Sequence, residues 1–298
     1  MEKMKKHILI IGIILLGLMS CTEKIDIKPV EGEQLIGVYG SITDELKNHK
    51  ITLSRTMQFY EEGEPEMVSG ASIFVNDGFD TLWYEETEDK GIYQTVTEFA
   101  GVSGHTYHLS VDLPEHEGGG HYFAQSTMLP NIETIDSLVI KQYQVANLIF
   151  NNVLGLYPYF QSINDNDIYY MVKVAVNDSI AGGEKITNCG IYNLGGMSGW
   201  YVNGELMAKL AGEIPVWSFA DEGGSSDSLK ILHHGDTVRL DLSVISSGYA
   251  NYVSDISSSN GSNPMLGTPS NVCTNIGPDG KAVGYFYTAA TKNKTIIY

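Results

Sequence analysis

The sequence predicts an all-β protein, in which an N-terminal Ig-like β-sandwich packs on a second β-rich domain with one short helix. Short segments with period-two alternation of apolar and polar residues recur along the chain, as in Ile51–Ser54 and His105–Val111. Asp77-Gly78 separates two more such segments, which is a strong β-hairpin signal. Short strands spaced by turn residues are typical of β-sandwiches.

The N-terminal sandwich is expected over residues 34–130. Its strands are predicted near residues 35–39, 51–54, 71–75, 81–84, 91–96 and 105–111. The alternation places one face of each strand in a core and the other face outward.

The second domain is expected over residues 131–298, where the loops lengthen. Ile168–Val176 is predicted as a strand, and Ser228–Leu232 with Thr237–Val244 as a hairpin. The single predicted helix starts at Ser247, a residue type that caps helices, and ends near Asn260-Gly261. Its apolar positions follow the i, i+3, i+4, i+7 pattern, namely Tyr249, Tyr252, Val253 and Ile256.

The N-terminus has the layout of a secretory signal peptide over residues 1–20. Three lysines precede the apolar run Ile8–Met19, which is shorter than the roughly 20 residues that span a bilayer. Leu18-Met19-Ser20-Cys21 resembles the bacterial lipobox, which implies lipidation of Cys21 and anchoring to a membrane. The alternatives are an ordinary signal peptide with a chance cysteine, or a short N-terminal anchor. Residues 21–33 would form a polar tether.

The formal net charge of -18 excludes nucleic acid and anionic membrane surfaces as natural partners of the chain. Beyond Cys21 there are two cysteines, Cys189 and Cys273. They could form one disulfide in an oxidising compartment, or they could be two separately buried thiols.

No catalytic motif stands out, so the chain is expected not to be an enzyme and to need no cofactor. The serines among glycines lack the G-x-S-x-G spacing of a nucleophile elbow, and no phosphate-binding loop is present. His116 and His121 flank three consecutive glycines, which forbid the helix that a zincin site needs. They could hold a metal only in a flexible loop, and the alternative is a solvated hairpin loop without metal.

Aromatic residues offer candidate ligand contacts. Tyr157 and Tyr159, and further along Trp200 and Tyr201, fall in stretches that have the composition of loops. Loops carry binding residues disproportionately, and Tyr and Trp anchor interfaces. The alternative is that these rings are buried under long loops.

The chain also resembles a known family. Gly40, Val68-x-Gly70-Ala71, Gly91-Ile92-Tyr93 and Gly104-His105-Thr106-Tyr107 resemble the prealbumin-like sandwich of carboxypeptidase-regulatory-like modules. The whole mature chain is similar to Bacteroidota lipoproteins of the domain of unknown function 4249. The motifs that carry this similarity are Met128-Leu129-Pro130, Ile135-Asp136, Asn263-Pro264, Pro269-Ser270-Asn271-Val272, Thr274-Asn275-Ile276 and Val283-Gly284-Tyr285-Phe286.

This resemblance implies an envelope lipoprotein that accompanies a TonB-dependent outer-membrane transporter, and it transfers no catalytic or ligand residue. The sequence thus leads to the expectation of a non-enzymatic accessory or binding lipoprotein in nutrient capture. The alternatives are a cell-surface structural or adhesion protein, and a hydrolase whose site is not recognised.

Five triplets resemble the Asp-Ser/Thr-aliphatic O-glycosylation site of exported Bacteroidota proteins, which is more than the roughly one expected by chance from average composition. The residues expected to carry the glycan are Thr81, Ser137, Ser179, Ser228 and Thr237. The alternative is that Asp-Ser and Asp-Thr pairs form the turns that open strands.

Overall fold

The computed structural model of the chain divides into Met1–Glu33 and a compact unit, Gln34–Tyr298. The structure describes residues 33–57, 63–145, 148–165, 167–177, 179–180, 192–194, 197–199, 202–203, 212, 215–222, 229–261 and 272–298. Cys21, the signal peptide and most of the tether lie outside the described residues. In the described part, no helix is long and apolar enough to cross a membrane.

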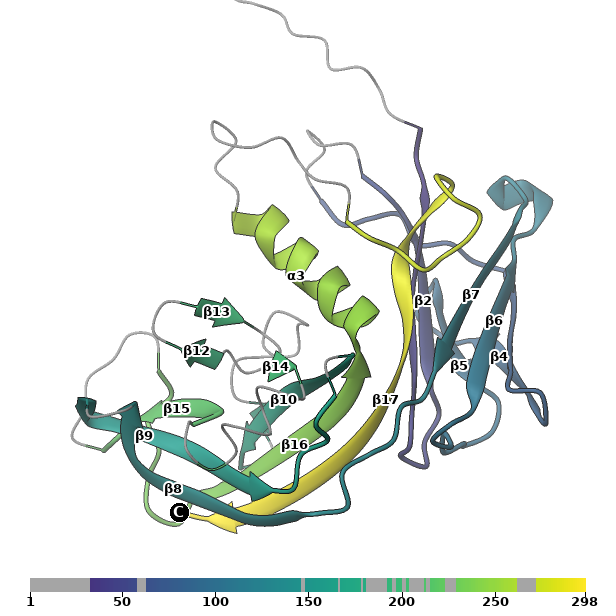
Figure 1. Ribbon diagram of the computed structural model, residues 1–298. Coiled ribbons are helices and arrows are strands. Elements are labelled where there is room, and N and C mark those ends of the chain that lie inside the picture. Colours follow the sequence, from purple (N-terminus) through teal and green to yellow (C-terminus); the bar gives the residue numbers. More distant parts are fainter. Residues whose placement is uncertain are drawn as a thin grey trace, which may run out of the picture. The chain divides into compact units, whose positions relative to one another are not determined.

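The described unit is built mainly from strands, which confirms the all-β prediction (Figure 1). The first group of strands is β1 (Ile36–Thr43), β2 (Lys50–Arg55), β3 (Ser72–Asn76), β4 (Thr81–Glu86), β5 (Ile92–Thr95), β6 (Thr106–Asp112) and β7 (His121–Thr127), with a 3-10 turn η1 (Glu115–Glu117) before β7. The second is β8 (Ile135–Val145), β9 (Leu148–Phe160), β10 (Ile168–Val176), β11 (Ser179–Ile180), β12 (Tyr192–Leu194), β13 (Met197–Gly199), β14 (Val202–Asn203), β15 (Trp217–Ala220), β16 (Thr237–Ser246) and β17 (Ala282–Ile297).

One large sheet runs through both halves of the unit, in the order β11-β10-β16-β17-β1-β2-β5-β4-β3-β6-β7. The 16-residue strand β17 makes this possible. Its first half pairs in parallel with β1, and its second half pairs antiparallel with β16 (Figure 1). The predicted domain boundary at residue 130 falls between β7 and β8 and stays a prediction, because the two halves share this sheet.

The N-terminal part of the sheet encloses a core and gives the β-sandwich-like body. Alternate residues of β1 are buried, as the period-two pattern predicted. Tyr93, Tyr107 and Phe286 are among the largest side chains of this core. The Ser126 and Thr288 hydroxyls are 3.0 Å apart, so β7 and β17 face each other across the body.

A second core lies between the β8-β9-β15 sheet and the C-terminal part of the large sheet. Leu156, Phe219 and Leu240 are fully buried in it. A third, smaller cluster lies beneath the helix α3 (Ser247–Gly261) and is rich in tyrosine. The predicted helix is therefore confirmed, but Ser246 rather than Ser247 caps it, because the Ser246 Oγ accepts a hydrogen bond from the Tyr249 N–H at 3.3 Å.

The predicted hairpin between Ser228–Leu232 and Thr237–Val244 is wrong. The second segment is a strand, but β10 and β17 occupy both of its edges along the whole length. Ile231 instead forms a parallel bridge with Ala220 of β15. Local alternation could not show this, because the partners of β16 come from distant parts of the chain.

Candidate functional site

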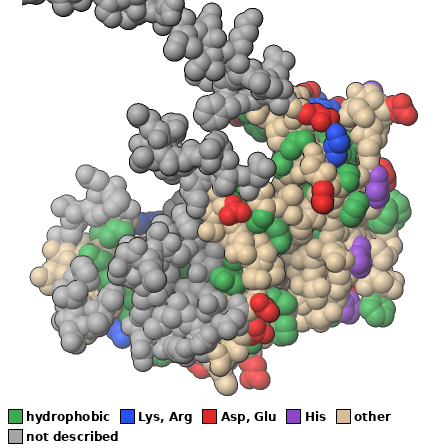
Figure 2. Space-filling model, turned by 45° about the horizontal axis from the view of Figure 1, so that its top comes forward, with side chains coloured by type: hydrophobic (Ala, Val, Ile, Leu, Met, Phe, Trp, Pro, Cys, Tyr) green, Lys and Arg blue, Asp and Glu red, His purple; other side chains and the backbone are tan. Residues whose placement is uncertain are grey.

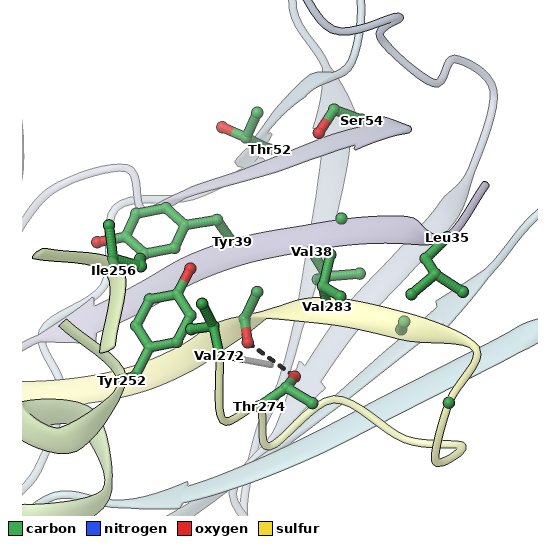
Figure 3. A pocket seen from close by; sticks show the side chains of 14 residues that line it. Leu35, Val38, Tyr39, Thr52, Ser54, Tyr252, Ile256, Val272, Thr274 and Val283 are labelled. Carbon is green, nitrogen blue, oxygen red and sulfur yellow. Dashed lines mark hydrogen bonds between the residues drawn. The ribbon is translucent and has the colours of Figure 1, made fainter. Parts of the chain in front are cut away.

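A groove of about 620 Å³ opens on the outward face of the large sheet, where β17 and β1 begin and the antiparallel strand β2 ends (Figure 3). Its volume falls in the range of small-molecule sites, roughly 300–1,000 Å³. The lining residues come from these three strands, the end of α3 and the segment before β17: Leu35, Gly37, Val38, Tyr39, Thr52, Ser54, Tyr252, Ile256, Val272, Thr274, Gly280, Ala282, Val283 and Gly284.

Small residues form the floor of the groove. Gly37 points outward from β1, between Ser54 of β2 and Val283 of β17. Because Gly37 has no side chain, the Ser54 hydroxyl can lie close to the strand backbone there, and a Cβ at Gly37 would come within 2.9 Å of the Ser54 Oγ. Gly284 adopts a φ of +100°, and a Cβ there would collide with the Val38 carbonyl, so glycine is required for this close approach of β17 to β1.

Two tyrosines close one end of the groove. Tyr39 of β1 and Tyr252 of α3 line it (Figure 3). Both belong to a packed group with Tyr249, Tyr285 and Tyr287. The Tyr249 and Tyr287 rings stack with centroids 3.7 Å apart, and the Tyr252 and Tyr285 rings lie at 5.1 Å. This end of the groove is therefore formed by ring faces and edges that other rings hold in place.

Burial keeps these phenols protonated. Burial raises the pKa of Tyr39 above its ordinary value, and the nearby Tyr287 adds to the rise, while the hydrogen bond with Tyr249 opposes it. Burial also raises the pKa of Tyr252 to about 12. Both groups are thus neutral hydrogen-bonding groups at physiological pH.

None of the described residues that line the groove has a charged side chain. The Asp255 carboxylate lies just beyond it and accepts a hydrogen bond from the Cys273 backbone N–H at 3.0 Å. Partial desolvation, followed by this carboxylate, raises the pKa of the largely exposed Cys273 thiol to about 11, so the thiol is protonated and a poor nucleophile. A charged ligand would lose its hydration without gaining a counter-charge, so the groove suits a neutral molecule.

The wall formed by residues 272–276 is fixed by side-chain hydrogen bonds to the strands. Asn275 donates from Nδ2 to the Phe286 carbonyl at 2.7 Å and accepts at Oδ1 from the Phe286 N–H at 2.9 Å. The same Nδ2 also donates to the Gln125 carbonyl at 3.2 Å. The Thr274 hydroxyl donates to the Gly284 carbonyl at 2.8 Å (Figure 3). The Thr274-Asn275-Ile276 motif therefore holds the groove wall against β17.

Two of the four sequence-predicted aromatic contacts, Tyr157 and Tyr159, do not line this groove, and the other two cannot be compared. Tyr157 and Tyr159 were expected in a loop, which is wrong, because both lie inside β9. The Tyr157 ring is 1% exposed and packs in the interior, with Lys141 Nζ 4.3 Å from its centroid. Tyr159 is half-buried. Trp200 and Tyr201 lie outside the described residues, and ligand contact by any of the four stays a prediction.

The histidine loop is a hairpin connection between β6 and β7. The loop contains three glycines with positive φ, Gly118, Gly119 and Gly120. Arg55 contacts the loop through a 2.9 Å ion pair with Glu117. His121 pairs with Asp112 at 2.8 Å, while His116 is exposed. Among the described residues, no group of three or more His, Cys, Asp or Glu side chains is placed to hold a metal ion.

The Cys273 thiol is free and exposed, whereas Cys189 lies outside the described residues, so a disulfide between them stays a prediction. Of the predicted glycosylation sites, Thr81 and Ser137 are exposed and Thr237 is half-buried. Three of these candidates are the first residue of a strand, namely Thr81, Ser179 and Thr237. This position supports the alternative in which the Asp-Ser/Thr pairs form turns that open strands. Ser228 lies outside the described residues.

The groove was not predicted from the sequence. Its residues come from four stretches that are far apart in the sequence, 35–39, 52–54, 252–256 and 272–284, and the outward positions of β1 carry no unusual composition. The one signal was the C-terminal motif run, which contributes Val272, Thr274, Val283 and Gly284 to the lining.

Fold and groove together define an all-β protein with a groove of small-molecule size on a sheet face, lined by uncharged side chains among the described residues. The chain belongs to the family described as Domain of unknown function (DUF4249), which matches residues 22–295. No curated protein matches the sequence.

Proposed function

We propose that this protein is a non-enzymatic binding lipoprotein of the bacterial outer membrane that holds a small neutral molecule in the groove. The observation that carries the proposal is the groove, whose described lining residues are uncharged, with a floor of small residues and a tyrosine wall. A flat apolar ligand with hydroxyl groups suits it, because Thr52, Ser54 and the tyrosines offer hydrogen-bonding groups beside the apolar surface.

Anchoring and partnership rest on the sequence. The lipobox-like end of the signal peptide supports lipidation of Cys21. The similarity to Bacteroidota lipoproteins with a prealbumin-like sandwich supports association with a TonB-dependent transporter in nutrient capture. The acidic charge of the chain is consistent with a soluble body tethered by its lipid.

Ligand binding is tested by native mass spectrometry of the lipoprotein purified in mild detergent from its own membrane. The wild type should carry a co-purifying neutral compound. Val283→Trp should lose it, because the indole fills the groove. Thr295→Trp is the matched control, since Thr295 is an exposed residue of the same strand. Equal occupancy in both variants would exclude the groove as the binding site.

The partnership is tested by a pull-down of the tagged protein from the same membrane. A TonB-dependent transporter at near-equal stoichiometry supports the proposal. Recovery of the lipoprotein alone, at native expression and low salt, would contradict docking and favour adhesion. Turnover of a glycan or peptide by the purified protein would show an enzyme instead.

A further inference from the structure

A row of side chains, apolar except for Ser110, crosses the outward face of the sandwich at right angles to its strands. Val96 follows β5 and donates its N–H to the Trp83 carbonyl of β4 at 3.0 Å. Trp83 pairs with Phe74 of β3, Phe74 with Ser110 of β6, and Ser110 with Phe123 of β7. The row therefore spans five adjacent segments of one sheet.

These side chains are open to solvent. Trp83 is 55% exposed, Val96 54% and Phe123 51%. The outward face of a sheet with one solvated side is normally polar, so apolar groups at four of the five positions of this row indicate an interaction surface. Figure 2 shows hydrophobic and histidine side chains close together on this side of the molecule.

The row is one residue wide and has polar side chains on both sides. Outward side chains two positions along each strand form the two flanks. One flank consists of Thr81, Asn76, His108 and Gln125, and the other of Gln94, Glu85, Ser72, Asp112 and His121. All of these side chains can donate or accept hydrogen bonds.

Several of the groups are held in place. The Phe74 and Trp83 rings lie 5.2 Å apart, and the His121 ring stacks on Phe123 at 6.0 Å. The His121 Nδ1 is also 2.8 Å from an Asp112 carboxylate oxygen. A ligand on this face would meet a partly ordered surface, which lowers the entropic cost of binding.

We propose that this row binds a neutral polysaccharide laid across the strands. Aromatic rings stack on the C–H faces of sugar rings, and the two flanks lie where the equatorial hydroxyls of such a chain would extend. Adjacent strands are about 4.8 Å apart, so an extended glycan meets a new side chain at each strand. A protein partner would require a broader apolar patch than a single row.

Charge restricts the class of glycan. The row and its flanks contain no lysine or arginine, and Glu85 and Asp112 are acidic. The whole chain has a formal net charge of -18. Anionic polysaccharides are therefore excluded by repulsion. The inference is independent of the groove, which lies on β17, β1 and β2.

The test is affinity electrophoresis of the full-length, detergent-solubilised lipoprotein in gels that contain starch, dextran, mannan or xylan, with a pull-down on cellulose. Polygalacturonate serves as the anionic comparison. At least one neutral polymer should retard the wild type, and polygalacturonate should not. Trp83→Ala should weaken binding about tenfold, and Trp83→Tyr should restore most of it, because a ring face is regained.

Ile297→Ala is the matched control, since Ile297 is an exposed apolar residue at the far end of β17. It should bind like the wild type. Circular dichroism of each variant checks that the fold is kept. Failure of all the neutral polymers to bind would overturn the proposal. So would binding that is unchanged in Trp83→Ala, or a Trp83-dependent cross-link to a protein in place of a glycan.

Discussion

The hydroxyl of Tyr39 lies 2.8 Å from the hydroxyl of Tyr249, although 210 residues separate them in the sequence. β1 places Tyr39 beside Tyr285 of β17, and α3 lays Tyr249 over both strands. This contact joins the N-terminal strand, the C-terminal strand and the helix at one end of the groove. The groove therefore depends on the assembled unit and not on a single segment.

The first prediction concerns that hydrogen bond. Tyr249→Phe should lower the free energy of unfolding by about 1–2 kcal/mol, because Tyr39 loses this bond in a buried setting. Tyr39→Phe should cost a similar amount, and the double variant less than the sum of the two. Urea denaturation measures all three, with Tyr122→Phe, a half-buried tyrosine outside the cluster, as control. Strict additivity would show that the two hydroxyls are not coupled.

The second prediction concerns alkaline pH. Burial raises the pKa of Tyr252 from its ordinary 10.0 to about 12 and also raises those of Tyr39 and Tyr84. The unfolded chain releases these protons first, so stability is complete below about pH 10 and is lost as the pH rises towards about 12. Denaturation at several alkaline pH values should show this decline, and Tyr252→Phe should make it shallower.

Phenolate absorbance provides the check on this pH prediction. The folded protein should show a late-titrating class of tyrosines that merges with the rest when the protein unfolds. If every tyrosine ionised together near pH 10 while circular dichroism stayed native, the buried cluster would be disproved.

The third prediction concerns the groove wall. Asn275→Ala removes the hydrogen bonds to both backbone groups of Phe286 and to Gln125. Stability should fall by about 2–3 kcal/mol, since the buried Phe286 amide loses its partner. Asn293→Ala changes an exposed asparagine of β17, the strand that contains Phe286, and should be nearly neutral. Thermal unfolding compares the two, and equal melting temperatures would refute the role assigned to Asn275.

The fourth prediction separates backbone strain from steric collision. Gly78 and Gly284 have φ values of +89° and +100°, but a Cβ at Gly78 meets no atom within 4 Å, whereas at Gly284 it strikes Val38. Gly78→Ala should cost about 1–2 kcal/mol from φ alone. Gly284→Ala should cost more than about 3 kcal/mol and loosen β17 from β1. Urea denaturation ranks the two, and the reverse order would contradict the close approach of the strands.

The sequence predicted the elements of this fold better than their partners. Period-two alternation located β1 and β6, because each buries one face locally. The same alternation predicted that β16 pairs with Ser228–Leu232, which is wrong. β16 pairs with β10 and β17, which lie far from it in the sequence. Pairing across such distances leaves no local signal.

The groove and the aromatic row show the same limit. Trp83 and Phe123 look ordinary within their own strands, and only the register across β4, β3, β6 and β7 brings them into one row. Tyr157 shows the opposite error. The stretch around Pro158 has the composition of a loop, but it forms part of β9, and the Tyr157 side chain is buried. Burial is decided by tertiary packing, which composition does not specify.

The fifth prediction concerns glycosylation. Among the described candidate sites, Ser137 and Thr81 are exposed, and the Thr81 hydroxyl already accepts a hydrogen bond from the Asn76 side chain at 2.8 Å. Ser137 is therefore expected to be modified more completely. Intact-mass measurement of the native protein should show hexose-sized increments, and Ser137→Ala should remove one glycan. Ser126→Ala is the control, since Ser126 is half-buried and has no preceding aspartate. A native mass equal to that of the unmodified lipoprotein would leave the Asp-Ser and Asp-Thr pairs with their strand-opening role alone.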